Sequence, residues 1–258
     1  MTFEQHYNAL ALLGSGFLLM HCMVHRDGTS VDLTVMSASP SSASDAPNAV
    51  VIEAPSGDRV TILRAYVVLS RVELVACSEA SVWKRMQELW APAIAHAHGR
   101  NTLTAWAIPN VIAPIDIQQR ETWVADLHPP AGRYCTVRVS FDAADSDAEA
   151  LPSDVSMVGR SLRIEGHYSA AGELGSHLFS YECTGAVTRE LPLLDDTGAP
   201  TQLELRSEQL RATIRIEFTF DDLFDGVDLI PGTDPVRADL VLQNALAHTR
   251  ARLSLEDE

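Results

Sequence analysis

The sequence LRATIRIEFTF, residues 210–220, decides the fold, because apolar and polar residues alternate strictly along it. The apolar positions are Ala212, Ile214, Ile216, Phe218 and Phe220. Successive side chains of a β-strand point to opposite faces, so one face of this strand is expected to be buried and the other to face water. Strands with one buried face are typical of antiparallel sheets.

Similar patterns occur elsewhere in the chain. Residues 133–141 alternate in the same way, with Cys135, Val137, Val139 and Phe141 on one face. Residues 60–69, 161–168 and 177–183 are also rich in β-forming residues. The sequence therefore predicts a chain dominated by antiparallel sheet of the sandwich type.

Three helices are expected beside these strands. The first spans about residues 2–13, and the second runs from residue 79 to about 98 with a kink at Pro92. The third begins at Pro235, after Asp234 as N-cap, and continues to about residue 253. Its last turn would contain His248, Arg250 and Arg252. The predicted fold class is α+β, with N-terminal, central and C-terminal helices.

Charged residues are distributed unevenly along the chain. Residues 1–141 carry 12 acids and 10 bases, whereas residues 142–258 carry 23 acids and 9 bases. Residues 142–154 contain five acids and no base, as linkers often do. We therefore expect a β-rich unit at 1–141, an acidic linker or loop at 142–154, and an acidic antiparallel β unit at 155–258. A single domain with a long surface loop fits the same pattern.

The cysteines and the N-terminus predict a cytoplasmic protein. No two cysteines have the spacing of a zinc site or a redox motif, so we expect structural thiols, with a pair of disulfides as the alternative. The apolar stretch 9–24 is too short for a spanning helix and follows no Lys or Arg, which argues against a signal peptide. The cysteines are Cys22, Cys77, Cys135 and Cys183.

Neither of two possible metal sites is complete in the sequence. A calcium loop starting at Asp221 would place Leu223 and Gly232 at two ligand positions. His96 and His98 lie two residues apart, with no carboxylate or thiolate at suitable spacing nearby. We predict no metal and no cofactor, although the sequence leaves both sites open.

The most enzyme-like group consists of Glu165, His167 and His177. Glu165 and His167 share one face of a predicted strand, and the next strand could bring His177 near them. Such a group could transfer protons in a hydrolase, but a water-facing strand produces the same pattern without any catalysis. The four tryptophans, of which Trp123 is one, are expected in the core; an exposed one would suit a protein interface.

The leading hypothesis is a non-enzymatic binding protein that docks a basic protein partner, for example an inhibitor or immunity-type protein of a toxin or nuclease. Its net charge of −16 would attract such a partner and would repel nucleic acid and anionic membranes. The expected contact residues are Asp195, Asp196, Asp221, Asp222, Asp225 and Asp228. The alternatives are a hydrolase with dispersed His, Asp and Glu residues, and a structural or assembly subunit. The sequence leaves the oligomeric state open.

Overall fold

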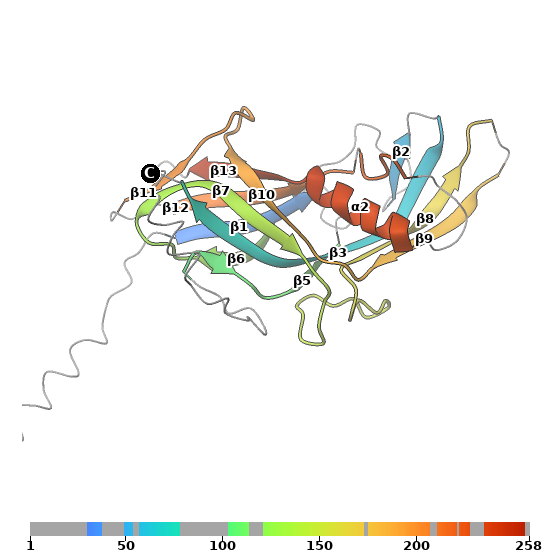
Figure 1. Ribbon diagram of the computed structural model, residues 1–258, viewed down its shortest axis with the longest axis horizontal. Coiled ribbons are helices and arrows are strands. Elements are labelled where there is room, and N and C mark those ends of the chain that lie inside the picture. Colours follow the sequence, from blue (N-terminus) through green and yellow to red (C-terminus); the bar gives the residue numbers. More distant parts are fainter. Residues whose placement is uncertain are drawn as a thin grey trace, which may run out of the picture.

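A computed structural model gives the fold of the chain. The described residues are 30–37, 49–53, 57–77, 103–113, 121–172, 175–206, 211–220, 222–227 and 235–255. They are mostly β-strand, and the strands curl into one mixed sheet with the shape of a half-barrel (Figure 1).

The described residues contain thirteen strands and one helix. The strands are β1 (Ser30–Ser37), β2 (Val50–Glu53), β3 (Arg59–Ala76), β4 (Ala105–Trp106), β5 (Asn110–Ile112), β6 (Thr122–Leu127), β7 (Gly132–Phe141), β8 (Leu162–Ser169), β9 (His177–Cys183), β10 (Val187–Leu194), β11 (Leu203–Leu205), β12 (Arg211–Phe218) and β13 (Arg250–Leu255). The helix is α2 (Pro235–Ala247).

The strands follow the order β6-β1-β12-β13-β10-β7-β3-β8-β9 across the sheet. β2, β4 and β5 also pair with β3, and β11 pairs with β7. Strands from before and after residues 142–154 are neighbours, because β1 pairs with β12, β3 with β8 and β7 with β10. In Figure 1 the strands β2, β8 and β9 extend to the right with the first part of β3.

The core lies on the inner face of the curled sheet. Leu33 on β1, Val139 on β7 and Ile214 on β12 are among its fully buried residues. The helix α2 contacts β9 and β10 and buries Val241 and Leu246 in the same core. Burial of this apolar surface is the main force that holds the sheet and the helix together.

The predicted fold class is wrong. The described residues form a mostly β protein with a single curled sheet, and α2 is their one helix. The helices expected at residues 2–13 and 79–98 lie outside the described residues. Alternating burial on many strands indicates a covered face, but a curled sheet can cover its own face as well as two stacked sheets can.

The pairing direction predicted from residues 210–220 holds for only one neighbour of β12. This strand pairs antiparallel with β13 but parallel with β1 along eight residues. Alternation reports which side chains are buried, and it does not report the direction of the next strand. The strands predicted at 60–69, 133–141, 161–168 and 177–183 are confirmed in β3, β7, β8 and β9.

The C-terminal helix is shorter than predicted. It ends at Ala247, and residues 250–255 form β13. The Thr249 hydroxyl donates a hydrogen bond of 2.7 Å to the Ala245 carbonyl at this boundary. Ala251 and Leu253 are then buried at alternate positions, so the segment that would have held the last turn extends the sheet.

The cysteine prediction is wrong for two of the four residues. Cys77, after β3, forms a disulfide with Cys135 on β7. Cys183 is a free, buried thiol as predicted. Cys22 lies outside the described residues. Wide sequence spacing hid the pair, because only the antiparallel pairing of β3 with β7 brings the two cysteines together.

Candidate functional site

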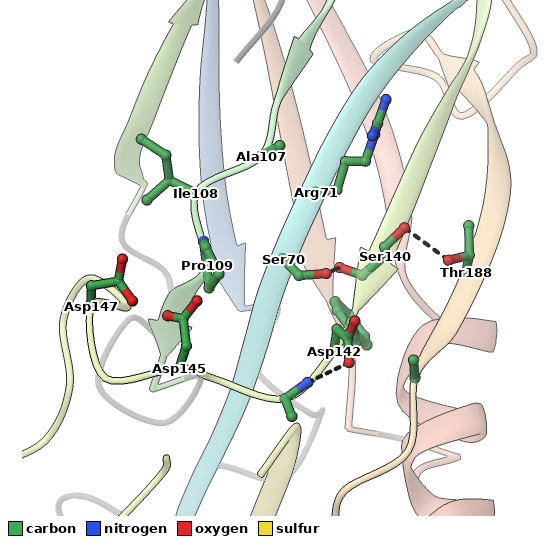
Figure 2. Close-up of a pocket in the computed structure, with 13 residues that line it drawn as sticks. Ser70, Arg71, Ala107, Ile108, Pro109, Ser140, Asp142, Asp145, Asp147 and Thr188 are labelled. Carbon is green, nitrogen blue, oxygen red and sulfur yellow. Dashed lines mark hydrogen bonds between the residues drawn. The ribbon is translucent and has the colours of Figure 1, made fainter. Parts of the chain in front are cut away.

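A cavity of about 420 Å³ lies where the interior of β3 passes the end of β7 and the start of β10 (Figure 2). The connection between β4 and β5 and the first residues after β7 complete its wall. We call it the acidic cavity, because Asp142, Asp145 and Asp147 line it. Its size is within the range of sites that hold small ligands or single side chains.

Three neighbouring strands supply hydroxyl groups to the cavity. Ser70 lies at a register shift of β3, and its hydroxyl donates a hydrogen bond of 3.0 Å to the Ser140 carbonyl of β7. The Ser140 hydroxyl is 2.8 Å from the Thr188 hydroxyl of β10. Figure 2 shows these three side chains in a row across the sheet. The polar, outward-facing side of the strands thus forms one wall.

The three aspartates come from residues 142–154, which we call the acidic loop. Ala144 and Ala148 of this loop are buried in a small second core together with Val68 and Val111. The Glu149 amide donates a hydrogen bond of 2.8 Å to the Pro109 carbonyl, which ties the loop to the β4–β5 connection. Because these alanines face inward, Asp145 and Asp147, which lie between them in the sequence, line the cavity.

Figure 2 shows the carboxylates in two places around the cavity. Asp142 lies next to Ser140, whereas Asp145 lies below Pro109 and Asp147 lies to the left of Pro109. The Asp142 carboxylate accepts a hydrogen bond of 2.7 Å from the Ala143 amide. Within the described part of the chain, neither Asp142 nor Asp147 forms an ion pair.

The cationic residue of the cavity wall is Arg71, and it is directed elsewhere. Its guanidinium donates a hydrogen bond of 3.0 Å to the Glu73 carboxylate on the same strand. Arg138 on β7 lies 3.2 Å from the same carboxylate and also pairs with Glu190 on β10. We call these four residues the arginine–glutamate ladder. It neutralises the sheet face beside the cavity and includes none of the loop aspartates.

The structure keeps Glu165 and His167 on one face of β8, as predicted, but places His177 on the opposite face of the sheet. Glu165 accepts a hydrogen bond of 2.8 Å from Arg163 and lies 4.0 Å from Arg64. His167 is opposite Leu178 in the β8–β9 pair, whereas His177 is opposite Tyr168. Adjacent register positions place the two histidines on opposite faces of the sheet.

Four of the six carboxylates predicted as partner contacts are described, and they lie in two separate turns. Asp195 follows β10 and accepts hydrogen bonds from Thr197 and Ala199. These bonds, led by that of the Thr197 hydroxyl, lower the pKa of Asp195 below its ordinary value. Asp222 lies 3.3 Å from His248. Asp196 and Asp225 are exposed in the same two turns.

The remaining predicted residues, Asp221, Asp228, His96 and His98, lie outside the described residues. Over the described ranges, no group of three or more His, Cys, Asp or Glu side chains could hold a metal ion. In the same ranges no helix is long and apolar enough to cross a membrane.

Sequence reasoning missed the acidic cavity. Its signal was the run of five acids in residues 142–154, which was interpreted as a linker or loop without a site. The alanines at positions 144 and 148 gave a second signal, because small apolar residues within an acidic run can anchor it to a core.

Comparisons with protein-family models, with curated proteins and with solved structures found no match.

Proposed function

We propose that the chain is a non-enzymatic binding protein whose acidic cavity accepts a cationic side chain of a basic protein partner. An inhibitor or immunity-type protein of a basic toxin or nuclease is one concrete form. The observation that carries the proposal is the set of three cavity aspartates beside an arginine that is directed to Glu73. A guanidinium or ammonium group could replace water there and pair with two carboxylates.

The surrounding groups also suit such a ligand. The hydroxyls of Ser140 and Thr188 can accept hydrogen bonds from a guanidinium, which has five donors in a fixed plane. The net charge of −16 would raise the rate of encounter with a basic protein at low salt. A phosphate or carboxylate ligand would meet repulsion from all three aspartates.

Fewer observations support the two alternative hypotheses, a hydrolase and a structural or assembly subunit. For a hydrolase, Glu165 would have to act while paired with Arg163, and the two histidines would have to act from opposite faces. The structural-subunit hypothesis stays a prediction, and so does the cytoplasmic location. The Cys77–Cys135 disulfide argues against that location, because disulfides persist mainly in oxidising compartments.

Two triple variants test the proposal with a peptide of alternating glycine and arginine, titrated by calorimetry. The cavity variant carries Asp142→Asn, Asp145→Asn and Asp147→Asn. The matched variant carries Asp196→Asn, Asp222→Asn and Asp225→Asn, so both variants lose three negative charges. We expect the cavity variant to bind about 30-fold more weakly, at roughly 0.7 kcal/mol for each charged contact.

The matched variant should lose less than about three-fold, because it removes only long-range attraction that salt screens. Equal losses in the two variants would mean that the peptide senses net charge and that no site exists in the cavity. A larger loss in the matched variant would favour the residues predicted from the sequence. Thermal unfolding of both variants checks that the fold is intact.

A further inference from the structure

Trp123 is exposed on the outer face of β6. The side chain is 61% exposed, whereas Trp106 on β4 is 3% exposed in the core. The β1–β6 pairing shifts register between Leu33 and Thr34, so that Trp123 lies opposite Thr34 and Asp126 lies opposite Asp32. This bulge places Trp123 and Asp126 outside, while the two residues between them are buried. Large exposed aromatic side chains are common anchors of protein interfaces.

One carboxyl group contacts this indole, and a second carboxyl group lies opposite the first on the neighbouring strand. The Trp123 Nε1–H donates a hydrogen bond of 3.3 Å to the Asp126 carboxylate, which holds the edge of the ring at that carboxylate. A hydrogen bond with the Asp32 carboxyl lowers the pKa of Asp126, and the charges of His128 and Arg211 contribute in the same direction. The register of β1 with β6 puts Asp32 opposite Asp126, so both carboxyl groups lie on the side of the sheet where the indole is exposed.

We infer that Trp123, Asp126 and Asp32 form a second docking site, for an arginine side chain of a protein partner. A guanidinium stacked on the indole would gain a cation–π contact and would lie next to the Asp126 carboxylate. The two carboxyl groups would repel a phosphate or an acidic peptide. The inference rests on the proposed function for the basic nature of the partner, but it uses none of the cavity residues.

The indole ¹H–¹⁵N signal of Trp123 reports on this site alone, and Trp123→Phe identifies that signal. The probe is the peptide of alternating glycine and arginine, and the control peptide has citrulline in place of arginine, which keeps the shape and removes the charge. We expect a saturable shift of the signal with the arginine peptide and none with the citrulline peptide. Asp126→Asn should weaken the response about three-fold, whereas Asp225→Asn, with the same charge change, should not.

An indole signal that does not move, or that moves equally with both peptides, would overturn the inference. The cavity variant distinguishes the two proposals. If its Trp123 response persists while calorimetry finds no loss of binding, the cavity proposal fails and the Trp123 site stands. If the wild-type cavity binds the peptide while the Trp123 signal stays fixed, the Trp123 site fails and the cavity proposal stands.

Discussion

On the outer face of the sheet, Glu73 and Glu190 are paired with Arg138, whereas in the adjacent acidic cavity Asp142 and Asp147 have no ion pair within the described part of the chain. The ladder joins three neighbouring strands, so its charges cancel where the strands need to lie close together. The loop carries negative charge where the surface is hollowed. The difference indicates which carboxylates support the fold and which can meet a ligand.

The largest expected effect comes from the disulfide, which joins the ladder strands β3 and β7 but not the loop. Replacing both Cys77 and Cys135 by serine should lower the free energy of unfolding by about 4 kcal/mol, as expected for a separation of 58 residues. Urea unfolding measures this loss. Peptide affinity of the folded variant should be unchanged, and a large loss of affinity would show that the cavity depends on the same restraint.

A smaller effect is expected from Arg138→Leu, which leaves Glu73 opposed to Glu190 across β7. The free energy of unfolding should fall by about 1 kcal/mol, since the side chains are 23–47% exposed and solvent screens their interaction. The control is Arg206→Leu, because Arg206 is 76% exposed and, among the described residues, pairs with Glu204 alone. Equal stability changes in the two variants would contradict the role given to the ladder.

The smallest effect concerns Glu121, a carboxylate immediately before β6 that pairs with Arg215. The hydrogen bond from Arg215 lowers the pKa of Glu121 below its ordinary value. The stabilisation is therefore present above the ordinary pKa of about 4.3 and is lost as the pH falls through the lowered pKa. Urea unfolding between about pH 7 and pH 3 should show a loss below about 1 kcal/mol that Glu121→Gln lacks. An identical pH profile in the variant would contradict this assignment.

The sequence predicted where strands lie better than it predicted which strands pair with each other. Alternation located β7 and β12 because it depends on local burial, which a strand carries in its own residues. The parallel pairing of β1 with β12 joins segments about 180 residues apart, and no local pattern encodes that contact. The Cys77–Cys135 bond escaped prediction for the same reason.

The composition of the sequence showed the acidic loop, but it did not show where the loop lies in the fold. The acidic run at 142–154 could be recognised, but its position beside Ser70 and Thr188 depends on the order of β3, β7 and β10 in the sheet. The cluster around Asp225 was denser in the sequence, yet neither Asp222 nor Asp225 lines the acidic cavity. Density of charge along the chain is therefore a weak guide to where a ligand can enter.

The central claim is that the acidic cavity receives a cationic side chain, and amide chemical shifts of the whole chain test it most directly. The arginine and citrulline peptides are titrated in parallel into isotopically labelled protein. We expect the arginine peptide alone to shift the amides of Ser140, Asp142, Asp145, Asp147 and Thr188. Shifts confined to the turns at Asp195–Asp196 and Asp222–Asp225, with the cavity amides unchanged, would contradict the account.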